Sequence, residues 1–124
     1  MGESTFVLRQ RAFLKLYMIY KAEKGGLYGL QILEDLRDRF KDLGYRPTRS
    51  EVYKSLHELL HDGLIVRDTI QKEGTEMQKL YIYRLGDKEK IKAYKDLLKA
   101  DIDRSIALLN MALKDNYSQK RWGE

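Results

Sequence analysis

No cysteine occurs among the 124 residues of this chain. Disulfide bonds, thiol catalysis and thiolate zinc sites are therefore excluded. Long hydrophobic runs are missing as well: none approaches the roughly 20 apolar residues that a membrane-spanning helix needs, and the N-terminus carries no cleavable signal pattern. Together these absences predict a cytoplasmic protein.

Histidine is scarce too, and both copies fall in one short pattern. Residues 57–61 read His-Glu-Leu-Leu-His, the H-E-x-x-H spacing that holds zinc in a group of peptidases. A catalytic zinc needs a third protein ligand, and here a carboxylate such as Glu73 or Glu76 would have to serve. Phosphate-binding glycine loops and nucleophile elbows are absent, and 124 residues leave little room for a substrate cleft. We expect no metal site and no enzymatic activity.

Charge is biased towards the positive. Lysine and arginine number 24 against 19 aspartates and glutamates, which gives a formal net charge of +5. A surplus of this size is compatible with a polyanionic partner but does not require one. Its placement is more informative, because the cations form two clusters: Arg9, Arg11 and Lys15, and then Arg46, Arg49 and Lys54.

The hydrophobic spacing predicts three helices, two strands and a long final helix. Helices are expected at about 8–22 and 28–42, with apolar sides listed here: Phe13, Leu16, Tyr17 and Tyr20, then Leu30, Leu33, Leu36 and Phe40. Thr48, followed by Glu51, forms a capping box at the start of a third helix that ends at Gly63. Residues 64–70 and 79–85 read as a hairpin turning at Glu73-Gly74, and 87–116 as the long helix.

This order is that of a winged helix-turn-helix, an α+β fold, followed by a C-terminal dimerisation helix. A generic small α+β domain is the alternative. We expect a winged-helix DNA-binding region with an N-terminal arm over residues 1–86 and the dimerisation helix over 87–116, in the same compact domain. Residues 117–124 read as a loose tail.

The third helix separates its side chains into sectors when each residue is turned by roughly 100°. Apolar residues share one side, the carboxylates Glu51, Glu58 and Asp62 a second, and donors and cations the third: Arg49, Ser50, Tyr53, Lys54, His57 and His61. A helix that enters the major groove needs donors outward and carboxylates turned away from phosphate. Arg49 and Ser50 are placed to reach base edges, and Tyr53 and Lys54 to reach bases or phosphates.

The long helix carries a narrow apolar stripe at near-heptad spacing, interrupted by one serine. Its members are Ile91, Tyr94, Leu98, Ile102, Ser105, Leu109 and Ala112. A stripe that narrow suits a partner helix and predicts a homodimer. Packing within one chain is the alternative.

Several strings resemble one family. "QRAFLKLYMI", "LYGL" and "EVYKSLHELL" are similar, in register, to the bacterial replication terminator proteins of the Gram-positive type, and the likeness runs from about residue 6 to 116. The resemblance implies homodimers joined by antiparallel C-terminal helices. It also implies that two dimers cooperate on terminator sites in double-stranded DNA and stop the replicative helicase from one direction, without any cofactor. A more distant likeness to PadR-type regulators covers the fold alone.

The resemblance also implies roles for single residues. Arg9 and Arg11 would grip the DNA backbone and minor groove. The recognition region would be formed by Arg46, Arg49, Ser50, Tyr53 and Lys54. Tyr28, in "LYGL", falls where the family has a tyrosine implicated in helicase contact; ordinary packing is the alternative. The wing departs from the family in being less basic, which leaves Arg67 and Lys72 there. A plain transcriptional regulator without fork arrest is therefore the second hypothesis.

Overall fold

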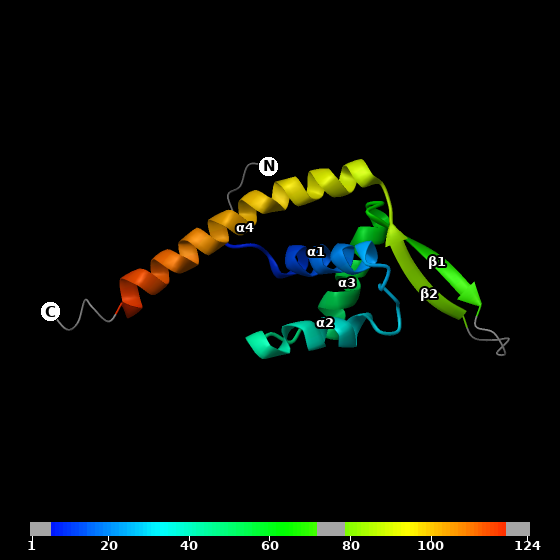
Figure 1. Cartoon of the computed structure of the whole chain (residues 1–124), viewed down its shortest axis with the longest axis horizontal. Coiled ribbons are helices and arrows are strands. Elements are labelled where there is room, and N and C mark those ends of the chain that lie inside the picture. The colour runs from blue at the N-terminus through cyan, green and yellow to red at the C-terminus, as the bar shows by residue number, and fades with distance from the viewer. Residues whose placement is uncertain (1–5, 72–78, 119–124) are drawn as a thin grey trace.

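The computed structural model describes residues 6–71 and 79–118. In chain order it contains α1 (Gln10–Glu23), α2 (Ile32–Phe40), the 3-10 helix η1 (Lys41–Leu43), α3 (Arg49–His61), β1 (Ile65–Gln71), β2 (Lys79–Leu85) and α4 (Lys88–Tyr117). Figure 1 shows α1, α2 and α3 packed together, the antiparallel hairpin of β1 and β2 to one side, and α4 running past the bundle. This is the predicted winged helix-turn-helix. No described helix is long and apolar enough to cross a membrane.

One hydrophobic core lies between the short helices, the hairpin and the first half of α4. Its fully buried side chains recur at three- and four-residue spacings: Leu14, Met18 and Ile19 in α1, Ile32 and Leu36 in α2, and Val52, Leu56 and Leu59 in α3. Burying each such side chain is worth about 1.5–3 kcal/mol. The core therefore fixes the orientation of α3.

The predicted apolar side of α1 forms the rim of this core instead of its centre. Phe13 and Tyr17 are half-buried and each lies 5.1 Å, centroid to centroid, from the ring of Phe40. Tyr20 is exposed, and the guanidinium of Arg39 lies 5.6 Å from the centre of its ring. The aromatic rings thus close the seam between α1 and α2 at the surface.

The predicted start of the second helix at residue 28 is wrong. Tyr28 instead forms a β-bridge with Ile82, flanked by two backbone hydrogen bonds. The N–H of Gly29 donates to the Tyr81 carbonyl at 3.0 Å, and the N–H of Tyr83 donates to the Leu27 carbonyl at 2.9 Å. Strand pairing with a distant segment therefore overrides the local helical spacing, and Leu30, expected on the apolar side, is 79% exposed.

The capping box predicted at the start of α3 is confirmed. The Thr48 side chain accepts a hydrogen bond from the Glu51 N–H at 3.1 Å. Arg37 of α2 donates from Nε to the carbonyl of buried Pro47 at 2.9 Å, which ties the turn to the preceding helix. The helix ends where Gly63 adopts φ 78°, as the sequence predicted.

A close backbone contact directs α4 away from the hairpin. The N–H of Gly86 donates to the Leu64 carbonyl at 2.9 Å, and that of Asp87 to the Gly63 carbonyl at 3.2 Å. A Cβ added to Gly86 would lie 2.2 Å from the Gly63 carbonyl oxygen, so a side chain does not fit there. Asp87 then caps α4 by accepting from the N–H groups of its first turn.

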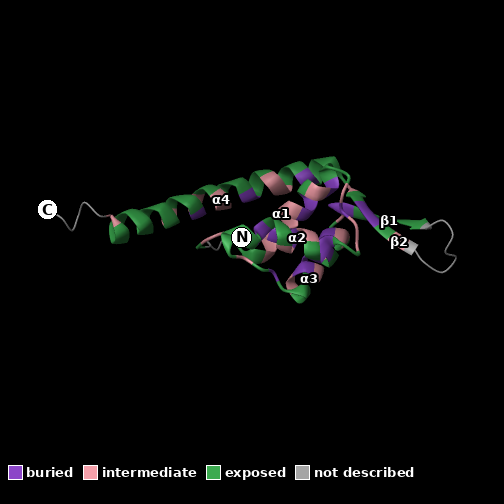
Figure 2. Ribbon diagram, turned by 60° about the horizontal axis from the view of Figure 1, so that its bottom comes forward, coloured by how far each residue is buried: buried purple, intermediate pink, exposed green. Residues whose placement is uncertain are grey.

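The two halves of α4 have different surroundings. Ile91, Leu98 and Ser105 are buried against the rest of the chain, whereas the residues after Ser105 are mostly exposed. Figure 2 shows this change along the helix, which projects beyond the bundle as an exposed rod. The predicted tail began at residue 117, but α4 includes Tyr117 and Ser118 follows it as the C-cap. Residues 119–124 lie outside the described residues.

Candidate nucleic-acid interface

The outward face of α3 presents polar and cationic side chains in a row. Arg49, Ser50, Lys54 and His57 are all exposed, while Val52, Leu56 and Leu59 of the same helix are buried. Because burial holds the apolar side against the core, the opposite side must face solvent. Ser50, Lys54 and His57 thus share the outward side, and Arg49 is exposed in the first turn of the helix.

Tyr53 lies at the edge of this surface and is half-buried. Its hydroxyl donates to the Gly29 carbonyl oxygen at 3.2 Å, beside the bridge to β2. The ring also packs against the core. Tyr53 is thus partly committed to holding α3 against the segment before α2.

Two predicted cations flank the face. Arg46 is exposed in the turn before α3, and Arg9 is exposed immediately before α1. Both residues come at or shortly before the N-terminus of a helix in the chain, where the helix dipole also favours an anion. Neither shares an element with the row on α3.

Arg11 and Lys15 face carboxylates of α3 instead of open solvent. Arg11 donates to Glu51 at 3.2 Å and to Glu58 at 2.7 Å, and Lys15 pairs with the other oxygen of Glu58. These contacts raise the pKa of Arg11, with Glu51 the larger cause, and lower the pKa of Glu58, with Lys15 the larger cause. Two members of the acidic sector predicted for this helix, Glu51 and Glu58, therefore have their counterions in α1, whereas Asp62 lies beside His61.

The wing contributes fewer open cations than the sequence suggests. The guanidinium of Arg67 lies 4.6 Å from the centre of the Tyr81 ring. Arg84 pairs with Asp68 across the strands at 2.5 Å. Lys72, and the turn predicted at Glu73-Gly74, lie outside the described residues.

Among the described residues, the H-E-x-x-H spacing does not form a three-ligand cluster. Glu58 is held by α1, and His61 places Nδ1 3.2 Å from the carboxylate of Asp62, at an exposed position. Within residues 6–71 and 79–118, no group of three or more metal-ligating side chains comes together. The candidate ligands Glu73 and Glu76 lie outside those residues.

The predicted stripe of α4 divides into two groups. Tyr94 and Leu98 pack on this chain's own core, and burial raises the pKa of Tyr94 to about 12. Ser105 is also buried, and its hydroxyl accepts from the Leu8 N–H at 2.7 Å. Ile102 is half-buried, whereas Leu109 and Ala112 are exposed. Tyr94, Leu98 and Ser105 form the first group. Their side of α4 is covered within the chain, because α1 and its preceding segment lie against it.

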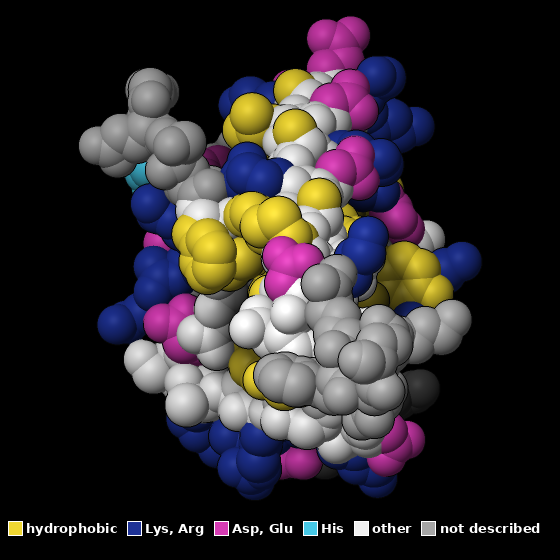
Figure 3. Space-filling view, turned by 90° about the vertical axis from the view of Figure 1, so that its left-hand side faces the viewer, with side chains coloured by type: hydrophobic (Ala, Val, Ile, Leu, Met, Phe, Trp, Pro, Cys, Tyr) yellow, Lys and Arg dark blue, Asp and Glu magenta, His cyan; other side chains and the backbone are white. Residues whose placement is uncertain are grey.

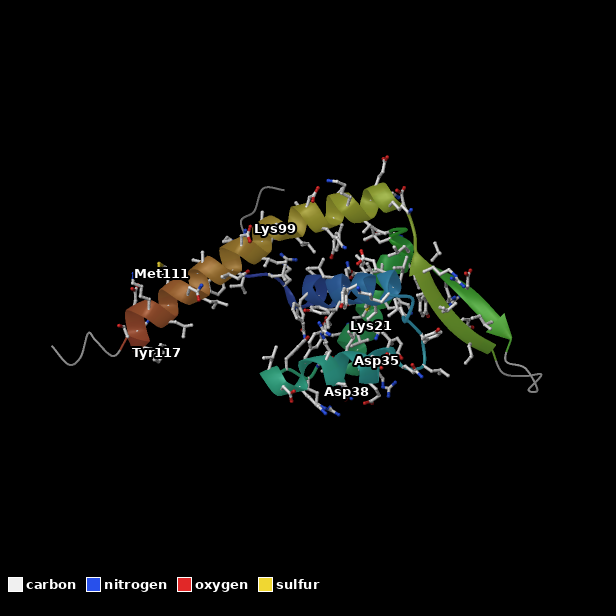
Figure 4. The ribbon with its side chains drawn as sticks, in the orientation of Figure 1. Lys21, Asp35, Asp38, Lys99, Met111 and Tyr117 are labelled. Carbon is white, nitrogen blue, oxygen red and sulfur yellow. The ribbon has the colours of Figure 1, made fainter. Side chains whose placement is uncertain are left out.

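Other apolar side chains on the second half of α4 escaped the sequence analysis. Ile106, Met111, Leu113 and Tyr117 are each more than half exposed. Their signal was available, since Ile106, Leu109, Leu113 and Tyr117 follow a three-and-four spacing. Figure 4 shows Met111 and Tyr117 on the projecting half of α4. It also shows Lys21 of α1 and Asp35 of α2, which form an ion pair at 3.3 Å within the bundle. On the side drawn in Figure 3, hydrophobic side chains gather in a band that is flanked by charged side chains of both signs.

Tyr28 is half-buried beside the hairpin. It lines a shallow hollow with Leu30, Gln31, Leu80 and Tyr81. Its backbone is held by the bridge to Ile82. Tyr28 therefore belongs to the sheet edge and not to the second helix, where the sequence had placed it.

A helix-turn-helix with a cationic outward face and a hairpin wing defines the class: this is a winged-helix protein. The chain belongs to the replication terminator protein family, whose model matches residues 5–117. It is 48% identical over 112 residues to the replication termination proteins of Bacillus subtilis and Bacillus spizizenii, covering 90% of this chain and 92% of each relative.

A solved structure shares the fold at lower sequence identity. The crystal structure of a candidate transcriptional regulator from Thermoplasma acidophilum superposes with a TM-score of 0.58 and 19% identity. The match covers 88% of this chain and 94% of that one. At this identity the likeness supports the fold and not a shared function.

Proposed function

We propose that this chain binds terminator sites in double-stranded DNA as a homodimer, with two dimers cooperating at each site, and arrests the replicative helicase arriving from one direction. Its family consists of DNA-binding proteins and not of enzymes, and its Bacillus relatives are named for replication termination. The observation that carries the proposal is the exposure of Arg49, Ser50 and Lys54 on α3. Its place of action would be the cytoplasm, on the nucleoid, and no cofactor is needed.

The α3 face suits the major groove. An arginine near the N-terminus of a recognition helix can bond two acceptors of a guanine edge, and a nearby serine can bond either kind of base. Lys54, one turn further on, reaches phosphate or base. Arg9, Arg46 and Arg67, together with Lys72, would add phosphate contacts, so that binding weakens steeply as salt is raised. Arg11 and Lys15, engaged with Glu51 and Glu58, are less suited to that role.

Dimerisation through the projecting half of α4 is supported by its unpaired apolar surface. Leu109, Leu113 and Tyr117 are each more than half exposed, and such a band on a monomer usually marks an interface. A two-fold dimer would set the separation of two α3 helices to match successive major grooves, roughly 34 Å apart. Since that dimer is symmetric, one-way arrest would need unequal half-sites or unequally bound dimers.

A binding assay with matched variants tests DNA recognition. Lys54→Ala removes a cation from the α3 face, whereas Lys92→Ala removes one from the exposed side of α4, where it pairs with Asp96. Duplexes selected by the wild type should bind Lys54→Ala roughly tenfold more weakly and Lys92→Ala about as tightly as the wild type. Equal losses for both variants would refute the placement of the interface.

Helicase displacement in both orientations tests the arrest. One-way blocking by paired sites is the expected result, and blocking in neither orientation would reject the terminator function while leaving DNA binding intact. Tyr28→Ala should keep DNA affinity and weaken blocking if Tyr28 touches the helicase. The second hypothesis, a transcriptional regulator, is supported by the fold likeness alone; a single palindromic site without blocking would favour it.

A further inference from the structure

Four charged side chains form a cluster between α1 and α3, beside the proposed DNA face. Arg11 contacts Glu51 and Glu58, which are two turns apart on α3, at 3.2 and 2.7 Å. Lys15, one turn further along α1, pairs with the second oxygen of Glu58. Two cations therefore meet two anions, and both oxygens of Glu58 are engaged.

The cluster lies on the flank of the recognition helix. Glu51 and Glu58 point roughly 90° around α3 from the row of Ser50, Lys54 and His57, given the helical turn per residue. A phosphate that approaches Lys54 therefore also comes near these carboxylates. Uncompensated, two negative charges at that distance would repel the DNA backbone.

Lys15 is the least accessible member of the cluster. Its side chain is 12% exposed, compared with 34% for that of Arg11. A lysine this covered cannot reach a phosphate without leaving Glu58, and doing so would leave one oxygen of that carboxylate without its partner. The geometry thus favours contacts within the protein for both cations.

We propose that Arg11 and Lys15 are positioning residues for DNA binding: they lock α3 onto α1 and neutralise Glu51 and Glu58 without touching the nucleic acid. This inference rests on the proposed DNA binding and assigns these two cations a role different from that of Arg49 and Lys54. It predicts that the need for Arg11 disappears when the carboxylates are removed. A phosphate-contacting arginine would be needed in either background.

The test is a double-mutant cycle read by DNA affinity across a salt series. Arg11→Gln is made in the wild type and in Glu51→Gln/Glu58→Gln, and each protein is titrated with a random-sequence duplex and with duplexes selected by the wild type. We expect a roughly 5- to 10-fold loss in the wild-type background and little loss in the neutralised one. The salt slope should stay unchanged. Equal losses in both backgrounds, with a slope reduced by about one, would mean that Arg11 contacts phosphate and would overturn the proposal.

A charge swap gives an independent readout. Lys15→Glu and Glu58→Lys should each weaken binding, and the two together should restore most of it, because the pair is rebuilt in reverse. No recovery in a double variant that melts like the wild type would also reject the proposal. Thermal unfolding of every variant separates loss of fold from loss of binding, and Lys92→Gln serves as the control for a lost surface charge. If the wild type binds neither duplex, it is the proposed DNA binding that fails.

Discussion

Ser105 joins the middle of α4 to the segment before α1. Its hydroxyl accepts from the Leu8 N–H at 2.7 Å and donates to the Asp101 carbonyl oxygen at 2.7 Å, at 9% exposure. The near-heptad stripe predicted Ser105 in an interface with a second chain. In the structure it holds the segment before α1 instead. The variants Ser105→Ala and Ser105→Leu distinguish packing within the chain from packing against a second chain.

The expected magnitudes follow from the contacts. Ser105→Ala leaves the part-buried Leu8 N–H without its acceptor, which costs about 1–3 kcal/mol. The higher helix propensity of alanine offsets about 0.5 kcal/mol of that loss. Ser105→Leu removes the same bond and also forces a larger side chain against the segment, which adds about 1–3 kcal/mol.

Urea unfolding at several protein concentrations is the assay. For each variant, the loss of unfolding free energy should be the same at every protein concentration. The loss should be larger for the leucine variant than for the alanine variant. Asn110→Leu, at an exposed position five residues further along α4, serves as the matched control and should change stability little. If Ser105→Leu instead raised stability, and did so more at high concentration, the side chain would face a partner and the reasoning would be refuted.

Three further predictions concern single contacts. Thr48→Ala should destabilise the fold by about 1 kcal/mol in urea, because the Glu51 N–H loses its cap, and Thr48→Ser should restore most of it. Gly86→Ala should lower the melting temperature by many degrees, since its Cβ would lie 2.2 Å from a carbonyl oxygen of the facing turn; a variant that melts like the wild type would contradict that close approach. Lys15, and next Arg11, lower the pKa of Glu58 below 4.5, so this carboxylate stabilises the fold above that pH, and the stabilisation is lost as pH falls through the lowered pKa. Stability measured from pH 6 down to pH 2 should therefore fall less in Glu58→Gln than in the wild type.

Local signals in the sequence were sufficient for most of the elements. The cap at Thr48, the left-handed glycine at position 63 and the β-branched strands each act within a few residues, so α3 and the hairpin were predicted close to their observed bounds. The outward face of α3 followed from the same periodicity, because burial of Leu56 and Leu59 leaves the opposite side exposed.

Contacts between distant residues could not be predicted in this way. Tyr28 joins Ile82, 54 positions along the chain, and that pairing replaces the first turn of the expected second helix. Arg11 finds its carboxylates 40 and 47 residues away. Net charge and clustering cannot distinguish a cation that is paired across the fold from one that remains open to DNA.

The long helix shows why one stripe was predicted where two surfaces exist. Taking about 100° per residue, Tyr94, Leu98 and Ser105 lie within a narrow sector that faces the chain's own core. Leu113 and Tyr117 are turned by roughly 100° from that sector, towards solvent, with Ile102 and Leu109 between the two. A stripe that drifts around a helix in this way can serve an intramolecular core at one end and a partner at the other. A second chain would then meet α4 on its flank beyond Ser105, and the dimer contact could change without disturbing the packing that orients α3.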